Sequence, residues 1–370
     1  MKIKDIAEQI EKIAPLNLAL DWDNVGLLIG DTQKNVKNIL LTIDITKDVV
    51  AEAKSLKTDL IVSYHPVIWD GLKTVTSEGP DSIVYELIRS NIAVFSVHTA
   101  LDIATGGVND GLAEIIGIQD GKPIGDYVVN HADDKYKLVV FVPAEALAKV
   151  SNAIFAAGAG AIGNYSNCGF STDGTGTFLP MDGAKPAIGK KGRLEKALEI
   201  RFETVVPAAK LDKVVTAMKE SHPYEMPAFD IIKLHDSQNK FGLGRIGRLA
   251  KPLQIEQIIQ RIKTKTGAKA AGIIGKEKRL VKTAAVCAGS CGKIINLVIA
   301  AKADLYLTGE LKHHQALAAQ EAGLTCICLS HSVSERFMLK ILAKRLQKQL
   351  NSVTIRVSTK DADPFTWKKI

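Results

Sequence analysis

Short, continuous apolar segments that end in small or polar residues recur along the chain, and they constrain its fold more than any other feature. Examples are NILLTIDIT, DLIVSYHP, AVFSVHTALD, AAVCAGS, ADLYLTGE and LTCICLSHS. Segments with helical spacing, such as residues 81–90 and 334–347, lie between them. Continuous apolar strands that alternate with helices are typical of a sheet covered on both faces, so the sequence predicts an α/β architecture.

The middle of the chain has a different pattern. The segments VPAEALAKV (142–150) and VPAAKLDKV (206–214) are identical at six of nine positions, and each follows a strand-like segment and opens a helix. Two successive β-α-β halves predict a ferredoxin-like α+β sandwich. Between them, GNYSNCGFSTDGTGTFLP (163–180) is rich in Gly, Ser, Asn and Thr, which predicts turns and hairpins.

The length of the chain favours more than one domain. At 370 residues it exceeds the size at which one core usually keeps growing. The α/β pattern resumes after about residue 240. We therefore expect an outer α/β domain made of residues 1–129 and 239–370, with residues 130–238 inserted at an exposed loop, where few contacts cross.

Composition and charge limit the cellular setting and the partners. No apolar segment approaches the ~18 residues of a membrane span, and the N-terminal MKIKDIAEQIEKIAP intersperses charges as a surface helix does and a secretory signal does not. We expect a cytoplasmic protein without a membrane partner. The net charge of +8 is compatible with nucleic acid or another anion, but Lys and Arg are spread along the chain without a long basic block, which favours a solubilising surface charge.

The five cysteines predict thiols and not disulfides. An odd number of cysteines in a large chain argues against a disulfide framework. The pairs Cys287/Cys291 and Cys326/Cys328 lie in apolar segments, and no paired CxxC motifs support a structural zinc site. We expect buried free thiols.

The histidines carry the chemical signal. His65, His98 and His331 each follow an apolar segment, and the carboxyl ends of strands form the ligand crevice of open α/β sheets. Asp102 and Glu335 lie four residues after two of them, an offset that places two side chains on one helix face. A single histidine at a strand end is more often a hydrogen-bonded structural residue. Three imidazoles with two carboxylates suit one or two divalent ions such as Zn, Mn, Fe or Co, and not Ca or Mg.

A second pair of titratable residues follows the strand-like segment ADLYL. Glu310 and His314 in TGELKHHQAL are again four residues apart. They are candidates for orienting a metal ligand or for transferring a proton, and a solvated helix N-terminus is the alternative. His222 is expected to be structural or interfacial. The remaining histidines, His131, His235 and His313, are expected at the surface.

Six motifs resemble, in order, the signatures of the Nif-three-like family, whose members are also catalogued as GTP cyclohydrolase 1 type 2 homologues. The motifs are DWDNVGLLIG (21–30), SYHPVIWDGL (63–72), VHTALD (97–102), GVNDGLA (107–113), TGELKHHQAL (308–317) and SHSVSER (330–336). The resemblance covers roughly residues 1–127 and 240–370, and the insert resembles the PII- or CutA-like domain of longer bacterial members.

The resemblance implies a Nif-three-like outer α/β domain, an inserted ferredoxin-like domain and a toroidal homohexamer. It also implies a dinuclear metal site with ligands at His65, Asp102, His331 and Glu335, and with His98 as a further ligand or close neighbour. Many members have two adjacent histidines before the proline, whereas the first is Tyr64 in this chain. Tyrosine is a poor ligand near neutrality, so we expect one ion to be bound weakly or water to take that place.

A smaller departure from the family pattern concerns CAGSCG (287–292), where the family tends toward a Gly-Ser-Gly turn. It predicts that Cys291 lies close to the crevice.

Two functions remain open at the level of sequence. One is a metal-dependent hydrolase of the GTP cyclohydrolase 1 type 2 kind, in which water attacks ring C8 of a purine nucleotide and Glu310 or His314 transfers the proton. The basic charge would favour such a small anionic substrate. The other is a non-enzymatic metal-handling or regulatory ring protein whose insert senses a ligand. No P-loop or dinucleotide glycine motif supports phosphate recognition.

Overall fold

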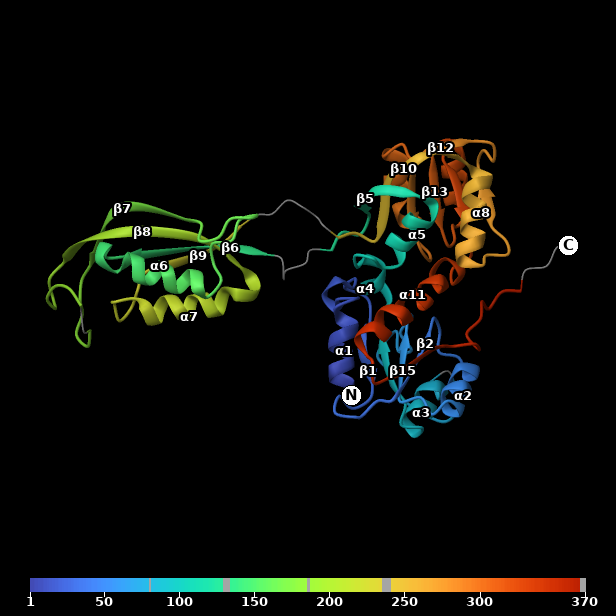
Figure 1. Ribbon diagram of the computed structural model, residues 1–370, viewed down its shortest axis with the longest axis horizontal. Helices are drawn as coiled ribbons and strands as arrows, with labels where there is room; N and C mark the ends of the chain where they lie inside the picture. The colour runs from blue at the N-terminus through green and yellow to red at the C-terminus, as the bar shows by residue number, and fades with distance from the viewer. Residues whose placement is uncertain (80, 129–133, 185–186, 235–240, 367–370) are drawn as a thin grey trace. The chain divides into compact units, whose positions relative to one another are not determined.

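The computed structural model describes residues 1–79, 81–128, 134–184, 187–234 and 241–366 (Figure 1). The chain divides into two compact units, Met1–Val129 with Asn239–Ile370, called the outer unit here, and Asn130–Gln238, called the insert. Within the described residues, the outer unit contains a five-stranded and a six-stranded sheet, and the insert contains a four-stranded sheet. The predicted mixed α/β architecture is confirmed, but it contains two separate outer sheets.

The first sheet of the outer unit is covered by helices on both faces. Its strands, in spatial order, are β1 (Gly26–Ile29), β4 (Ala93–Ser96), β3 (Leu60–Ser63), β2 (Asn38–Thr42) and β15 (Thr354–Val357). All neighbours are parallel except β1 and β4. Helices α2 (Lys47–Ser55) and α3 (Ser82–Arg89) pack on one face. Helices α1 (Ile3–Glu11) and α11 (Val333–Gln349) bury their apolar residues on the other (Figure 1).

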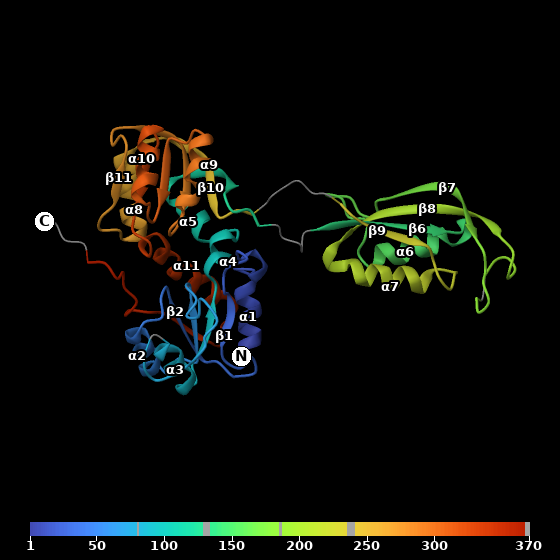
Figure 2. The ribbon, with the colours of Figure 1, turned by 180° about the vertical axis from the view of Figure 1, so that it is seen from behind.

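The second sheet has a parallel centre and antiparallel edges. Its order is β11 (Gly272–Ile274), β14 (Thr325–Cys328), β13 (Leu305–Thr308), β12 (Leu280–Cys287), β10 (Gly244–Gln254) and β5 (Ile118–Ile124). Strands β12, β13 and β14 are parallel to one another. Helices α9 (Ile295–Ala300), which follows the short turn η5 (Gly292–Ile294), and α10 (His313–Glu321) cover one face (Figure 2). Helices α5 (Val108–Ile116) and α8 (Ile255–Thr266) contribute to the core on the other.

One apolar core joins the two outer sheets. It contains Val62 and Phe95 from the first sheet, Leu307 and Ile327 from the second, and Met338 from α11. The short helices η1 (Leu16–Leu18) and α4 (His98–Ile103) complete the outer unit. The shared core brings the carboxyl ends of β3, β4 and β14 into one region, although these strands belong to different sheets.

The insert leaves and re-enters the outer unit at two neighbouring strands. Strands β5 and β10 pair antiparallel, with Ile124 opposite Gly244. Beyond them, Val128 forms an isolated bridge with Phe241. Because the insertion begins after β5 and ends before β10, which pair with each other, it interrupts no hydrogen bond of the outer sheet.

The insert has the element order β-α-β-β-α-β. Its elements are β6 (Lys135–Val142), η3 (Ala144–Ala146), α6 (Leu147–Ala156), β7 (Gly169–Phe178), β8 (Glu195–Pro207), η4 (Ala208–Lys210), α7 (Leu211–Ser221) and β9 (Phe229–Lys233). The sheet order is β7-β8-β6-β9 and all neighbours are antiparallel. Residues of α6 and α7 form the core with one face of this sheet.

The internal repeat has one local structure in both copies. Pro143 and Pro207 each precede a 3₁₀ turn that leads into α6 and α7. They therefore sit just before the first turn, where a proline's missing N–H leaves no bond unmade. Of the turns and hairpins predicted for residues 163–180, Gly169–Phe178 forms the first arm of an antiparallel hairpin with β8. Its glycines permit close packing, since a Cβ on Gly169 would lie 2.6 Å from Phe202.

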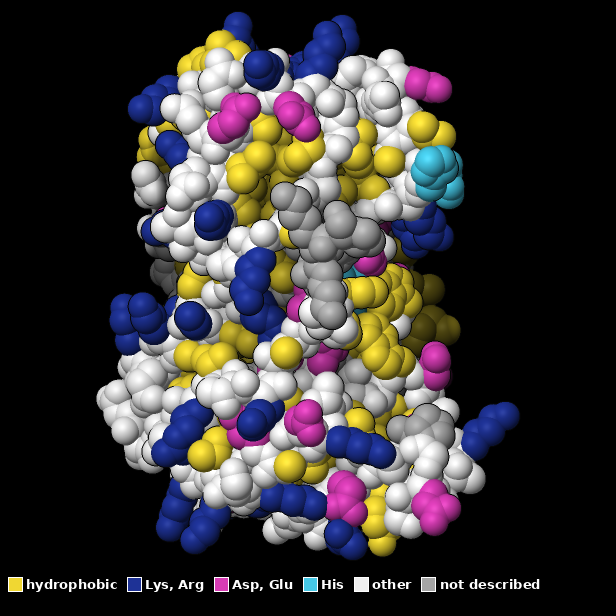
Figure 3. All heavy atoms as spheres, turned by 90° about the vertical axis from the view of Figure 1, so that its right-hand side faces the viewer, with side chains coloured by type: hydrophobic (Ala, Val, Ile, Leu, Met, Phe, Trp, Pro, Cys, Tyr) yellow, Lys and Arg dark blue, Asp and Glu magenta, His cyan; other side chains and the backbone are white. Residues whose placement is uncertain are grey.

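Other composition-based expectations concern thiols and surfaces. All five cysteines are free thiols, as the sequence predicts. Cys287, Cys291 and Cys326 are also buried as predicted, whereas Cys328 is only partly buried, as is Cys168. Among the described residues, no helix combines the length and apolarity needed to cross a bilayer. On the face in Figure 3, Lys and Arg side chains are separated by apolar and acidic ones and form no continuous basic stripe.

Candidate metal centre

Three histidine rings from both outer sheets form a continuous cluster. His65 follows β3, His98 opens α4 after β4, and His331 lies between β14 and α11. The ring centroids of His65 and His331 are 5.5 Å apart, and those of His65 and His98 are 5.1 Å apart. The structure therefore brings together the three predicted histidines, although 266 positions separate His65 from His331 in the sequence.

Glu335 lies between two of these imidazoles. Its Oε1 is 3.3 Å from His331 Nε2, and its Oε2 is 3.7 Å from His65 Nε2. Ligand atoms from the three residues all lie within 4.8 Å of one another, the only such metal-capable group found within the described parts of the chain. Glu335 is 2% exposed, and its Oε2 is buried without a hydrogen-bond partner among the described residues.

The Nδ1 atom of each imidazole in the cluster is hydrogen-bonded to a carboxylate. His65 Nδ1 is 2.8 Å from Asp44 Oδ1, and His98 Nδ1 is 2.8 Å from Asp23 Oδ1. His331 Nδ1 is 3.0 Å from Glu310 Oε1. A carboxylate acceptor keeps the proton on Nδ1 and leaves Nε2 free as a ligand atom, which is the usual arrangement behind metal-binding histidines.

Two of these carboxylates, Asp23 and Asp44, were not identified from the sequence. Although burial acts to raise the pKa of Asp44, the hydrogen bond from His65 lowers it. Burial also acts to raise the pKa of Asp23, but the hydrogen bond and the charge of His98, together with the hydrogen bonds from Thr99, lower it overall. Asp44 follows the apolar strand β2, so strand-end position was a usable signal, whereas Asp23 lies in a loop with no such pattern.

Tyr64 is bonded to the remaining carboxylate of the cluster. Its hydroxyl donates to Asp102 Oδ1, and its ring is 1% exposed. Burial raises the pKa of Tyr64 well above its usual range, and the nearby Asp102 and Glu335 carboxylates raise it further. Tyr64 therefore faces the cluster as a neutral phenol that engages Asp102. The segment His98–Ile103 is helical, as the four-residue offset between His98 and Asp102 assumes.

The two buried acids are destabilised as anions while no cation is near. Burial raises the pKa of Asp102 to about 6. Burial also raises the pKa of Glu335 well above its usual range, and the Asp102 and Asp44 carboxylates raise it further. A divalent ion between the histidines would reverse this penalty, because opposite charge favours the ionised carboxylate.

A glycine forms one wall of the cluster. Gly289 has φ +66°, and a Cβ on it would lie 2.7 Å from Glu335 Oε1 and 3.4 Å from His331 Nε2. The backbone after β12 thus leaves room beside the two ligand atoms that a side chain would fill. With the unpartnered Glu335 oxygen and the imidazole donors, this space fits a divalent ion of the Zn, Mn, Fe or Co type.

The other predicted residues lie at or away from the cluster. Glu310 contacts His331, as an orienting residue would, whereas His314 is exposed and contacts none of the described cluster residues. His222 is structural: its Nε2 is 3.0 Å from the Phe141 carbonyl oxygen. His313 is exposed, and His131 and His235 lie outside the described residues.

The sequence matches the family described as Duf34/NIF3 (NGG1p interacting factor 3) over residues 1–364. The chain belongs to this family. The resemblance to the Nif-three-like family, inferred from six motifs, is confirmed.

Relatives of this NIF3 chain match it over nearly its whole length. It is 36% identical over 369 residues to the "GTP cyclohydrolase 1 type 2 homolog" of Bacillus subtilis (strain 168), which covers 98% of each chain. It is 37% identical over 373 residues to the protein of the same name from Mycobacterium bovis, which covers 99% of this chain and 97% of that one. Its fold is similar to the crystal structure of a Bacillus cereus protein related to NIF3, with a TM-score of 0.81, 36% identity and coverage of 100% and 99%.

A side chain at Gly289 is expected to weaken metal binding in this NIF3 chain. In Gly289→Ala the new methyl group displaces Glu335 Oε1, so we expect roughly a tenfold or greater loss of Zn²⁺ affinity by calorimetry. Gly323→Ala is the matched control, because Gly323 has φ +68° and nothing within 4 Å of its Cβ position. Equal affinities in the two variants would contradict the role given to this wall.

The metal-free protein is expected to lose stability as the pH rises through Asp102's titration. The folded pKa of about 6 exceeds the ordinary 3.8, so this group's stabilisation is complete below about pH 4 and lost above about pH 6. Relative to Asp102→Asn, wild type should lose about 3 kcal/mol of unfolding free energy between pH 3 and pH 7. Urea titrations of EDTA-treated proteins measure this difference, and a pH-independent difference would contradict it.

Proposed function

We propose that this NIF3 chain is a divalent-metal-dependent hydrolase that adds water to a purine nucleotide, as a GTP cyclohydrolase 1 type 2-like enzyme would. The proposal rests on one observation: the buried Glu335 carboxylate lies between the imidazoles of His65 and His331. The Nδ1 atom of each of these imidazoles is hydrogen-bonded to another carboxylate. Family membership and the names of the curated relatives support the reaction class. One or two ions per chain, of the Zn, Mn, Fe or Co type, would be held by His65, His98, Asp102, His331 and Glu335.

A divalent ion held there would act as a Lewis acid and lower the pKa of a water molecule toward neutrality. The chain's own residues prepare that step. Asp44, Asp23 and Glu310 retain the Nδ1 protons and so orient the imidazoles. Glu310 has a half-exposed side chain, which suits it to pass a proton to solvent. His314, the other proposed proton carrier, would need to move toward the cluster to share that role.

The number of ions depends on Tyr64. We propose that the group of His65, His331 and Glu335 binds the tighter ion and that His98 and Asp102 bind a second one weakly, because Tyr64 occupies Asp102. Tyr64→His supplies an imidazole and removes this hydrogen bond, so it should tighten the second ion. Elemental analysis and calorimetry would show a second equivalent of Zn²⁺ per chain, and unchanged stoichiometry and affinity would contradict the assignment.

Hydrolysis is tested by formate release from GTP. The purified protein, loaded in turn with Zn, Mn, Fe or Co, should release formate, whereas a His331→Ala/Glu335→Ala double variant should not. Turnover no higher than that of the double variant, with every metal, would refute the hydrolase. We further propose assembly as a toroidal homohexamer, on the support of the family resemblance, and light scattering of the intact protein tests it.

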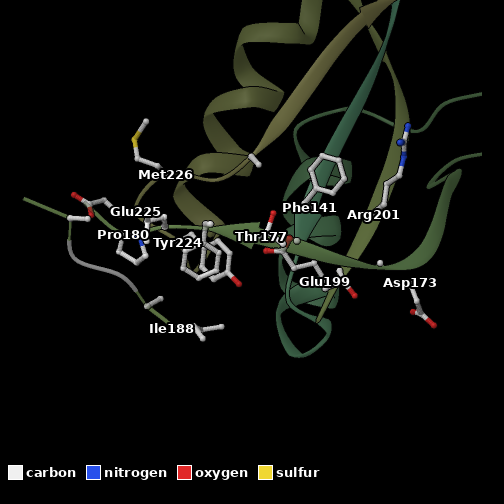
Figure 4. A pocket seen from close by; sticks show the side chains of 18 of the residues that line it. Phe141, Asp173, Thr177, Pro180, Ile188, Glu199, Arg201, Tyr224, Glu225 and Met226 are labelled. Atoms are coloured by element: carbon white, nitrogen blue, oxygen red, sulfur yellow. The ribbon is translucent and has the colours of Figure 1, made fainter. Parts of the chain in front are cut away.

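A second candidate function is a regulatory ring protein whose insert senses a small molecule, and a cavity in the insert favours it. We propose that the insert is a ferredoxin-like, PII- or CutA-like domain, which its strand order supports. It contains a cavity of about 580 Å³. In Figure 4 the side chains of Tyr224, Thr177 and Glu199, which line this cavity, lie next to one another, and that of Phe141 lies nearby.

A variant with a short linker in place of residues 130–238 distinguishes the two functions. Full turnover in this variant would make the insert regulatory or architectural. Absence of turnover in both proteins, with retained metal, would favour the regulatory ring protein.

A further inference from the structure

Two tryptophans stand exposed beside the metal cluster. Trp22 is 60% exposed and Trp69 is 52% exposed, and they are two of the chain's three tryptophans. Indoles are among the largest apolar side chains, and a folded chain usually buries most of their surface. Two that lie open at one place indicate a surface that a ligand or partner covers.

Both indoles contact the histidine cluster directly. The ring of Trp69 lies 5.3 Å from that of His98 and 5.8 Å from that of His65. The ring of Trp22 lies 5.8 Å from His98, and both tryptophans meet His98 edge to face. The exposed indoles are therefore in direct contact with residues proposed to bind metal.

The two loops that carry the tryptophans are fastened to each other and to α4. Asn24 Nδ2 donates to the Ile68 carbonyl oxygen at 2.7 Å, which joins the Trp22 loop to the Trp69 loop. Asp23 accepts from the Thr99 backbone N–H at 3.0 Å as well as binding His98. The loops that carry the indoles are thus ordered before a ligand binds. Binding to a preorganised surface loses less conformational entropy.

We propose that Trp22 and Trp69 form a stacking subsite for the planar heteroaromatic ring of the substrate, and that they hold a purine base against the metal cluster. Flat indole faces bind flat bases of any kind, and removing one such contact commonly lowers affinity several-fold to a hundredfold. This inference rests on the proposed hydrolase in its choice of ligand. It adds the residues that bind the ring and predicts binding in the absence of turnover.

The test is nucleotide binding by calorimetry, with metal-loaded and metal-free protein, using GTP, guanosine and ribose 5-phosphate. The Trp22→Leu/Trp69→Leu variant keeps apolar bulk but removes the indole faces. It should bind GTP and guanosine at least roughly tenfold more weakly than wild type. The Trp22→Phe/Trp69→Phe variant should recover most of that loss, and ribose 5-phosphate should bind equally to all three proteins.

Several results would overturn the subsite. They are unchanged guanosine affinity in the leucine variant, an equal loss for ribose 5-phosphate, or no binding of purine nucleotide to wild type at millimolar concentration. A smaller assembly mass of the leucine variant by light scattering, with nucleotide affinity retained, would instead show that a second copy of the chain covers the indoles. Quenching of wild-type tryptophan fluorescence by guanosine, with no formate release from GTP with any of the four metals, would retain the subsite and reject the hydrolase.

Discussion

Glu335→Gln is expected to abolish tight metal binding while leaving the metal-free protein as stable as wild type, or more stable. The glutamine amide has nearly the same shape but no charge to bind a cation between His65 and His331. We expect Zn²⁺ affinity to fall at least roughly a hundredfold, because loss of a direct ligand costs more than loss of its supporting residue. Burial raises the pKa of Glu335, which means that its charged form is destabilised without a cation. Replacing this carboxylate by an amide removes that cost from the metal-free protein.

Calorimetric Zn²⁺ titration and thermal unfolding of EDTA-treated protein check both parts of this prediction. Glu321→Gln, at an exposed position near the end of α10, is the matched control and should behave as wild type. Wild-type metal content in Glu335→Gln would contradict the metal assignment. A lower melting temperature of the metal-free variant would show that the carboxylate has a structural partner in the fold.

Arg245→Ala should destabilise the outer unit strongly. Arg245 is 6% exposed and bonds Asp110, the first acidic residue of α5. Its guanidinium also donates to the carbonyl oxygens of Ile103 at 2.9 Å, Gly242 at 2.6 Å and Gly244 at 3.1 Å. Removing it leaves these acceptors unpaired, so we expect a loss of about 3–5 kcal/mol in the free energy of unfolding.

The contrast with another arginine of the same strand makes that result specific. Arg248 lies three residues along β10 and is exposed, so Arg248→Ala should change stability by no more than about 0.5 kcal/mol. Urea unfolding, followed by a probe for each unit, measures both variants. Equal effects would show that the bonds of Arg245 are replaced by solvent. Because Ile103 ends the helix that carries His98 and Asp102, Arg245→Ala should also lower metal affinity.

The sequence was most informative where one local signal sufficed. His65, His98 and His331 each follow an apolar segment. The structure places Asp102 in the helix that His98 opens, and Glu335 in the first turn of α11, which begins two residues after His331. Strand ends of this kind are set by local hydrophobic patterning, which can be read without the tertiary fold.

The remaining features depend on contacts between distant segments. A pattern of apolar strands does not say which strands share a sheet, so the division into two sheets was not predicted. The contact of Asp23 with His98 spans 75 positions; Asp23 lies in the DWDNVGLLIG motif, but no local spacing pairs it with His98. The hydrogen bond from Tyr64 to Asp102 adds a role that the sequence did not suggest, because a residue expected to be a poor metal ligand acts in the fold as a hydrogen-bond donor.

The pairing of β5 with β10 determines the order in which the parts of the chain can be completed during synthesis. Ile124 must meet Gly244, which the ribosome adds 120 residues later. The elements of the insert are contiguous in sequence and are all present once residue 233 has emerged, so the insert can fold first, as domains commonly do. A folded insert shortens the free loop that the outer unit must close. His331 and Glu335 are made after the other residues of the cluster, so the proposed metal site can be completed only on a nearly finished chain.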